Sequence, residues 1–294
     1  MEALIVCMEC QALDGQPNLS SMRVARIPDD GLIEQTCNRG HKTLTIIQQV
    51  KFELLSQMAI QAIVDNYYRD AIASFTAALE RLYEFYTAAV CLKHGVAPTA
   101  FGAAWKSLAR QSERQLGAFV AAHLLDTGQG PQLMRPKQIE LRNDVVHKGR
   151  LATRDEAVSY GEAAVGCAQP ILDLLQKPAL IASTRTLVGE HLQDRFDVAR
   201  RAGVRPATYA LSTYFSLTNP SPIADVETAI ASCAAKPDFN EGVKQANALG
   251  AIHDLFRELA ALPASHATGV GDDQQESEAA AAKMRSSTPS HRPG

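Results

Sequence analysis

Four residues near the N-terminus have the types and the spacing that suit a metal ion. Cys7 and Cys10 form one Cys-x-x-Cys pair, and Cys37 and His41 form a second close pair further along. Two close ligand pairs separated by the length of a hairpin assemble a closed tetrahedral zinc site, and four protein ligands leave no position for water. We therefore expect a structural Zn²⁺ ion held by these four side chains.

Two other interpretations of the same residues stay open. The cysteines could be unrelated free thiols, or Cys7 and Cys10 could form a redox pair, although the strand and helix context of a thioredoxin-like motif is missing. From CMEC to CNRGH the chain resembles a zinc ribbon over about residues 5 to 45, with a second half that departs from the commoner Cys-x-x-Cys. Zinc ribbons often bind nucleic acid or protein, so the resemblance leaves the partner open.

A second set of chemically capable residues lies in the stretch ELRNDVVHKGR. Histidine can take a proton from a 2′-hydroxyl near neutral pH, and arginine can offset charge on a phosphate. Arg142 and His147 are five positions apart, which places them about 140° apart on a helix. Either the arginine reaches round the helix, the helix frays before Gly149, or matching groups come from a second subunit. The alternative is a histidine at a helix end beside a solvated arginine.

The motif Arg142-x4-His147, with the polar Asn143 directly after the arginine, resembles the Arg-x4-His motif of the HEPN superfamily. The flanking segments YYRDAIASFTAALERLYEF and RDEAVSYGEAAVGCAQPILDLL also look like HEPN bundle helices, so the resemblance covers about residues 60 to 176. It implies a metal-independent endoribonuclease that pairs two motifs at a homodimer interface, often in toxin-antitoxin or phage-defence systems. Other members keep the fold without activity.

The same resemblance assigns roles to individual residues. It implies that Arg142 and His147 are the catalytic pair and that Asn143 is auxiliary, orienting the imidazole. An acidic group on an earlier helix sometimes supports the arginine in this superfamily, so Glu80 and Glu84 are candidates. RNA is the implied substrate, and a cognate antitoxin or another protein is a possible partner.

The elements that must position these residues are mostly helical. Strand-like segments at 23–27 and 32–37, separated by the turn Pro28-Asp29-Asp30-Gly31, predict a hairpin. Apolar residues at intervals of three and four then predict helices, the clearest of which carries Tyr68, Ile72, Phe75, Leu79, Leu82 and Tyr86 on one face and ends at Gly95. The other expected helices run over 51–64, 101–125, 135–147 and 154–175.

We expect four regions: a zinc ribbon at 1–45, a HEPN-like helical bundle at 50–176, a mostly helical region without assigned function at 178–262, and a tail at 264–294. In the third region the sequence predicts helices at 186–201, 223–235 and 239–262, with an extended segment at 209–217. The tail has almost no bulky apolar residues, so it is expected to be disordered.

The formal net charge of −3 excludes a uniformly basic nucleic-acid binder. Residues 131 to 154 nevertheless carry a local surplus of four positive charges, which suits phosphate binding. A second basic stripe is predicted on the helix at 101–125. The surplus is formed by Arg135, Lys137, Arg142, Lys148, Arg150 and Arg154 against Glu140 and Asp144, and the stripe by Lys106, Arg110 and Arg114.

The start MEALIVCMECQ lacks the features of a secretory signal, and no apolar stretch approaches the ~20 residues of a membrane span. The six cysteines do not form a disulfide framework. We expect a cytoplasmic, mostly α protein that acts as a metal-independent endoribonuclease. The alternative is a non-catalytic RNA- or protein-binding module of the same fold.

Overall fold

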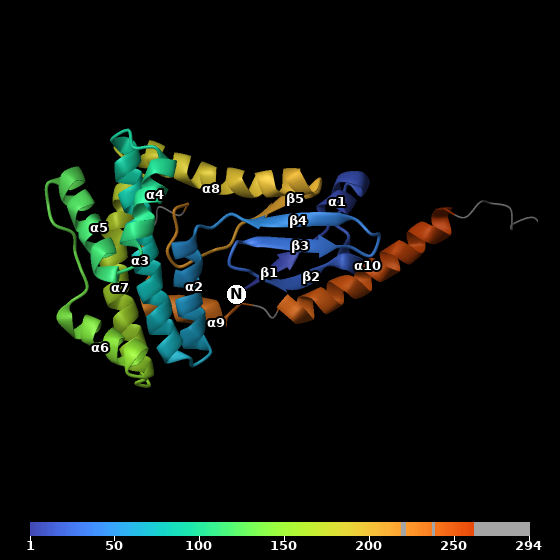
Figure 1. Cartoon of the computed structure of the whole chain (residues 1–294). Coiled ribbons are helices and arrows are strands. Elements are labelled where there is room, and N and C mark those ends of the chain that lie inside the picture. The colour runs from blue at the N-terminus through green and yellow to red at the C-terminus, as the bar shows by residue number, and fades with distance from the viewer. Residues whose placement is uncertain (219–221, 237–238, 262–294) are drawn as a thin grey trace, which may run out of the picture.

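The computed structural model describes residues 1–218, 222–236 and 239–261, and it confirms the predicted mostly α fold. A helical body and a smaller β part lie side by side, with α8 extending from one to the other (Figure 1). The helical body contains α2 (Lys51–Val64), α3 (Tyr68–Lys93), α4 (Pro98–Leu108), α5 (Ser112–Thr127), α6 (Pro136–His147), α7 (Arg154–Gln176) and α9 (Val226–Ala234).

The β part contains most of the remaining elements, and two long helices border it. Its elements are β1 (Glu2–Ile5), α1 (Met8–Asp14), the 3-10 turn η1 (Leu19–Ser21), β2 (Arg23–Arg26), β3 (Leu32–Thr36), β4 (Lys42–Ile47) and β5 (Arg205–Tyr209). The bordering helices are α8 (Ile181–Ala202) and α10 (Phe239–Ala261). Within the described residues, no helix is both long enough and apolar enough to cross a bilayer.

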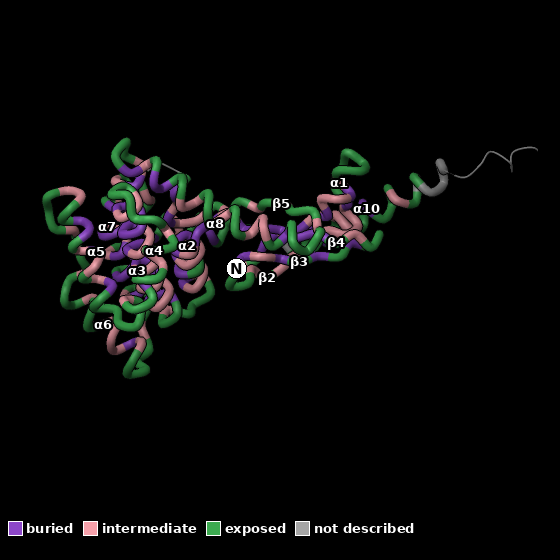
Figure 2. Tube along the Cα trace, turned by 45° about the horizontal axis from the view of Figure 1, so that its top comes forward, coloured by how far each residue is buried: buried purple, intermediate pink, exposed green. Residues whose placement is uncertain are grey.

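Helix α3 is the centre of the helical body, as its apolar pattern predicts. Ile72, Phe75, Leu82 and Tyr86 are fully buried along it, and α2, α5 and α7 all pack against it. The buried residues gather along the inner faces of these helices (Figure 2). The helix ends at Lys93, and Gly95 has the left-handed φ of 82° expected after a helix terminus.

The prediction of one helix over 101–125 is wrong. Helix α4 ends at Leu108 and α5 begins at Ser112, and the Gln115 side chain donates back to the carbonyl of Ala109 at 3.3 Å. The break lets both short helices pack on α3, where the rings of Tyr83 and Phe119 stack at 4.1 Å. Arg110 lies in the turn between them, so the predicted basic stripe does not run along a single helix.

The two strands of the predicted hairpin are present at the expected residues, but they do not pair with each other. β2 pairs with β1 and β3 pairs with β4, both antiparallel, so the turn at 28–31 connects two different sheets. Apolar side chains explain this choice, because Ala3 and Ile5 of one sheet cluster with Ile33 and Ile47 of the other. Packing two sheets face to face buries these side chains, which a single hairpin leaves in water.

The region at 178–262 contributes to both parts of the molecule. β5 pairs in parallel with β4, from Thr43 opposite Arg205 to Ile47 opposite Tyr209, while α9 packs against α2. The helices predicted at 186–201, 223–235 and 239–262 are present as α8, α9 and α10, the last described up to Ala261. The tail expected to be disordered lies outside the described residues.

Only the start of the extended segment predicted at 209–217 belongs to a strand, since β5 ends at Tyr209. Side chains at the start of α2 hold the rest. Gln49 exchanges two hydrogen bonds of 2.9 Å with the Leu211 backbone, and the Ser56 hydroxyl accepts from the Phe215 amide at 2.8 Å. These bonds satisfy backbone groups that no strand neighbour reaches.

Glu53 joins this segment to α2, and its loss should destabilise the protein. The carboxylate is 4% exposed and accepts from the amides of Val50 at 3.0 Å and Leu217 at 2.8 Å. Glu53→Ala leaves both buried amides unpaired, at about 1–3 kcal/mol each. We expect a clearly lower free energy of unfolding in urea, whereas the exposed change Met58→Ala on the same helix should cost under about 0.5 kcal/mol. Equal stabilities of the two variants would contradict this role.

Candidate functional site

Two short turns bring the four predicted metal ligands together. Cys7 caps the start of α1, and its sulfur accepts from the Cys10 amide at 3.5 Å. Cys37 follows β3 and His41 precedes β4, with the Gly40 amide donating to the Cys37 carbonyl at 3.0 Å. Gly40 has a φ of 80°, which glycine adopts without strain. Each ligand pair is therefore fixed by local backbone structure.

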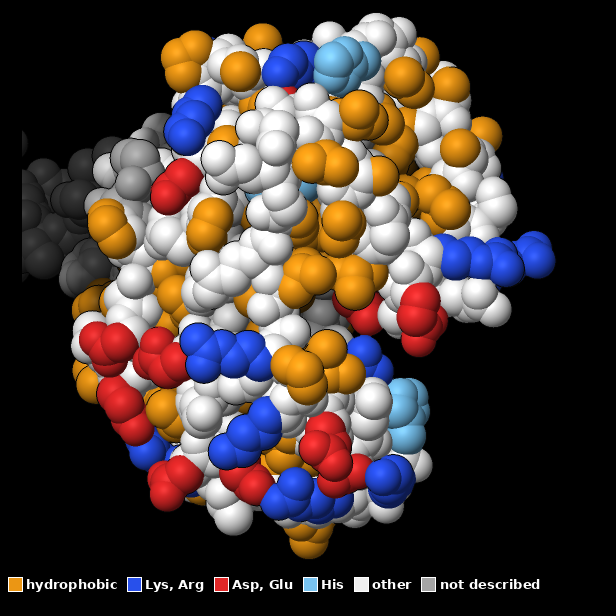
Figure 3. Space-filling view, turned by 90° about the vertical axis from the view of Figure 1, so that its left-hand side faces the viewer, with side chains coloured by type: hydrophobic (Ala, Val, Ile, Leu, Met, Phe, Trp, Pro, Cys, Tyr) orange, Lys and Arg blue, Asp and Glu red, His pale blue; other side chains and the backbone are white. Residues whose placement is uncertain are grey.

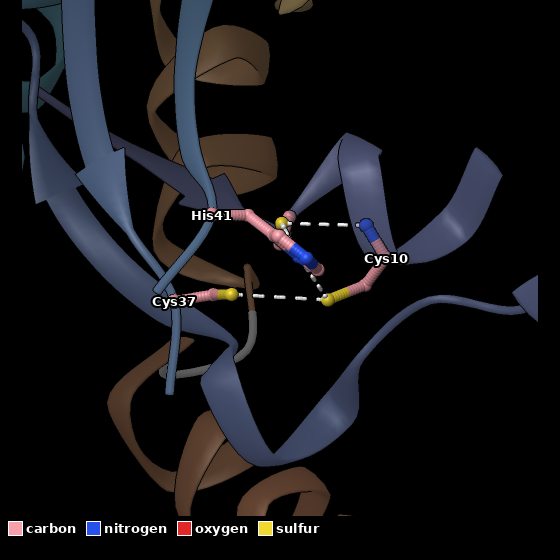
Figure 4. Close-up of side chains that lie close together, drawn as sticks. Cys10, Cys37 and His41 are labelled. Atoms are coloured by element: carbon pink, nitrogen blue, oxygen red, sulfur yellow. Dashed lines mark hydrogen bonds between the residues drawn. The ribbon is translucent and has the colours of Figure 1, made fainter. Parts of the chain in front are cut away.

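The side chains of these residues converge on one point (Figure 4). Their ligand atoms all lie within 4.8 Å of one another. The sulfurs of Cys10 and Cys37 are 3.8 Å apart, and His41 Nδ1 lies 3.2 Å from Cys10 Sγ and 4.0 Å from Cys7 Sγ. In a tetrahedral zinc site with Zn–S bonds of ~2.3 Å, two sulfurs lie ~3.8 Å apart and a sulfur and a nitrogen ~3.6 Å apart. This buried Cys3His group can hold a metal ion.

Burial and neighbouring hydrogen-bond donors act in opposite directions on the thiols of this cluster. Asn18 donates its side-chain amide to Cys10 Sγ at 3.3 Å, and the Arg39 amide donates to Cys37 Sγ at 3.4 Å. Burial raises the pKa of the Cys10 thiol to about 11. At Cys37 burial also acts to raise the pKa, but the hydrogen bonds from Arg39, His41, Cys7 and Cys10 together lower it. Burial disfavours a charged thiolate, and a bound cation would stabilise it. No motif in the sequence marks Asn18 as a neighbour of this cluster.

Helix α10 holds the turn between Cys37 and His41 from outside. Arg39 pairs with Asp14 and, at 3.3 Å, with Asp254 of α10, which also accepts from Ser20 at 2.7 Å. Gly250 lies against the backbone of Ser20, because an added Cβ would come within 2.3 Å of the Ser20 nitrogen. Helix α10, to which the sequence assigned no role, therefore contacts the turn that carries two of the candidate metal ligands.

Arg142 and His147 meet within a single chain. Arg142 Nη1 lies 3.5 Å from His147 Nε2, so the arginine reaches round the last turn of α6. His147 is exposed and is the final residue of the helix, and Gly149 follows with a φ of 72°. Asn143 is half-buried on the same helix, and the described chain shows no hydrogen bond between it and His147. The pair therefore presents a guanidinium and an imidazole side by side at the surface.

The two candidate acids lie in different surroundings. Glu80 and Arg142 line the same cavity of about 260 Å³ between α3, α5 and α6. Glu84, one turn further along α3, pairs with Arg81, which also donates to Gln115 at 2.6 Å. Burial raises the pKa of Glu84, and its pairing with Arg81 opposes that rise. Of the two, Glu80 is the one placed beside Arg142.

Half of the predicted basic surface is neutralised by ion pairs. Lys148 pairs with Asp144 at 2.8 Å, Arg150 pairs with Glu156, and Arg154 pairs with Glu227 at 2.6 Å. Glu156 and Glu227 lie outside residues 131 to 154, so contacts with the rest of the chain reduce the positive surplus of this segment. Among the described residues, the cations of this segment without an ion pair are Arg135, Lys137 and Arg142. The free positive charge is thus concentrated on α6.

Comparisons were made with protein-family models, with curated proteins and with solved structures. None of the three yields a match to this chain. The Cys3His cluster and the Arg142 and His147 pair are therefore the features of this chain that point to a function.

Proposed function

We propose that this protein is a metal-independent endoribonuclease of the HEPN type, with Arg142 and His147 as its catalytic pair. The observation that carries the proposal is the 3.5 Å approach of the two side chains at the exposed end of α6. A base and a cation at this separation can contact the 2′-hydroxyl and the phosphate of one nucleotide together. The unpaired charge on α6 and the resemblance of the bundle helices to HEPN helices support the same function.

The proposed reaction uses the RNA's own nucleophile. His147 Nε2 takes the proton of the 2′-hydroxyl, and the 2′-oxygen attacks the adjacent phosphorus while the bond from phosphorus to the 5′-oxygen breaks. Arg142 offsets the negative charge that grows on the phosphate oxygens. The leaving 5′-oxygen gains a proton from an imidazolium or from water. The products are a 2′,3′-cyclic phosphate and a 5′-hydroxyl, and no metal-bound water is needed.

In this proposal the metal has a structural role. The Cys3His donors suit Zn²⁺, and all four positions of a tetrahedral ion would be filled by protein. A two-layered β part this small buries few large side chains, so a metal supplies stability that its core lacks. Chelation is therefore expected to act on the β part and not on the chemistry at α6.

We further propose a homodimer that brings two α6 helices together. Leu124 and Leu125 on α5 are 52% and 79% exposed, and Ile139 on α6 is 42% exposed. Hydrophobic side chains gather on the face of the molecule formed by these helices (Figure 3). Exposed apolar side chains on the face that also carries α6 suit a symmetric contact in which each chain covers the same surface of its partner.

We expect sedimentation to give a dimer at micromolar concentration and Leu125→Asp to give a monomer, because the aspartate would be buried without a partner in the interface. Leu13→Asp is the matched control, since Leu13 is 65% exposed on α1, in the β part. A parent protein that is monomeric, or a Leu125→Asp variant that stays dimeric, would count against this interface.

The ribonuclease itself is tested by incubating the purified protein with single-stranded and looped RNA in EDTA and analysing the product ends. Cleavage that leaves a 2′,3′-cyclic phosphate is expected. Failure of the folded dimer to cleave any RNA would instead favour a non-catalytic RNA- or protein-binding module of the same fold. In that case fluorescence anisotropy with uncut RNA distinguishes the two kinds of module. Binding indicates an RNA-binding module, and no binding indicates a protein-binding one.

A further inference from the structure

The cavity beside Arg142 is lined mainly by apolar side chains. Its volume is about 260 Å³, below the ~300–1,000 Å³ of sites for drug-sized ligands, so it suits a small planar group. The apolar wall comes from α3, α5, α6 and the segment before α6, and includes Leu79, Tyr83, Leu116, Met134 and Ile139. In Figure 3 the hydrophobic side chains of this face surround a hollow.

Three charged side chains line this cavity together with its apolar wall: Glu80, Arg142 and Glu113, the last of which is exposed at the start of α5. Glu80 lies on the α3 side and Arg142 on the α6 side. Burial raises the pKa of the Tyr160 hydroxyl in the same cavity, whereas the Thr76 hydrogen bond and Arg142 act to lower it and Glu80 to raise it, so both charges act on the same group. Tyr160 itself is occupied by a 2.8 Å hydrogen bond with Thr76. Within the described part of the chain, Glu80 has no hydrogen bond or ion pair.

We propose that this cavity binds one unpaired guanine base of the RNA, with the Glu80 carboxylate accepting from the guanine N1–H and N2 amino groups. The inference rests on the proposed ribonuclease function, because Arg142 belongs to both sites. It holds the phosphate at the mouth of the cavity while the base of the same nucleotide enters. Single-stranded RNA is commonly recognised through bases that are splayed out, packed on side chains and hydrogen-bonded along the Watson–Crick edge.

The choice of guanine follows from the chemistry of the carboxylate. An ionised carboxylate only accepts hydrogen bonds, and guanine presents two adjacent donors on its Watson–Crick edge. Adenine and cytosine present an amino group beside an acceptor nitrogen, and uracil presents one N–H between two carbonyl oxygens. The three other bases would therefore place an acceptor against Glu80, which costs free energy because that acceptor loses its hydrogen bonds to water without gaining a donor.

The test uses short oligonucleotides with one variable base, each carrying a 2′-O-methyl group at that nucleotide so that it cannot be cleaved. Binding is measured by fluorescence anisotropy on the full chain. We expect the guanine oligonucleotide to bind about 10- to 100-fold more tightly than the adenine, cytosine and uracil versions, since hydrogen bonds to a charged group supply the difference. Inosine, which lacks the N2 amino group, should lose a large part of this preference on the unaltered protein.

Glu80→Gln should remove the guanine preference while leaving the other three affinities within about three-fold, because an amide presents a donor where the carboxylate has an acceptor. Glu140→Gln on the exposed surface of α6 is the control and should change nothing. Equal affinity of the parent for all four bases overturns the guanine site, whether or not RNA is cleaved. A Glu80→Gln variant that weakens every base equally also overturns it and makes Glu80 a support for Arg142. A preference for guanine together with failure to cleave unmodified RNA would support the guanine site and contradict the ribonuclease activity.

Discussion

His147→Ala and Arg142→Ala should each lower the rate of RNA cleavage to near background. Removing one positioned base typically costs ~10²–10⁴ in rate, and removing a cation that stabilises transition-state charge costs ~10²–10³. Both side chains are on the surface at the end of α6, so neither change should unfold the bundle. Single-turnover cleavage of a labelled RNA in EDTA, with circular dichroism of each variant, measures both expectations.

His94→Ala is the matched control for this experiment. His94 is also an exposed histidine at the end of a helix, but it follows α3 and has no neighbouring arginine in a hydrogen bond among the described contacts. Its cleavage rate should equal that of the parent. DNA of the same sequence should survive, because it has no 2′-hydroxyl. Cleavage by His147→Ala and Arg142→Ala at the parental rate would place the activity elsewhere.

Cys10→Ser should lose the metal and unfold the β part. We expect elemental analysis of the parent protein to find one zinc per chain and the variant to retain almost none, since structural zinc sites contribute ~10–16 kcal/mol of apparent binding free energy in small domains. Cys10 stands at the centre of the cluster, with both Cys37 Sγ and His41 Nδ1 within 3.8 Å of its sulfur. Limited proteolysis should then cut within residues 1–47 first.

Cys91→Ser provides the control, because Cys91 is half-buried on α3 and far in sequence from the cluster. It should keep its zinc and its resistance to proteolysis. Since α10 braces the ligand turn through Asp254 and Arg39, loss of the metal should also expose α10 to protease. A parent protein without stoichiometric metal, together with a Cys10→Ser variant of parental stability, would rule out a structural metal site.

Sequence patterns predicted the features that depend on residues close together in the chain: helix positions, a helix end and the pairs of candidate metal ligands. The period of apolar residues located α2, α3, α6 and α7, because one face of each helix must be buried. Gly95 marked the end of α3 through its preference for a left-handed backbone. The Cys7, Cys10, Cys37 and His41 cluster was predictable for a related reason. Each ligand pair sits in one tight turn, so spacing alone brings its two side chains together.

Tertiary structure decided the features that depend on contacts between distant segments, such as strand pairing and the break between α4 and α5. Burial of Ala3 and Ile5 against Ile33 and Ile47 set the strand pairing, and packing on α3 divided the helix predicted at 101–125. Glu227, far along the chain, neutralised Arg154, and the pairing of Asp254 with Arg39 set α10 against the candidate metal ligands. The placement of Glu80 beside Arg142 came from the packing of α3 against α6. Such contacts form because they bury apolar surface or pair charges in space, and an apolar period shows that a face is buried without showing which distant segment covers it.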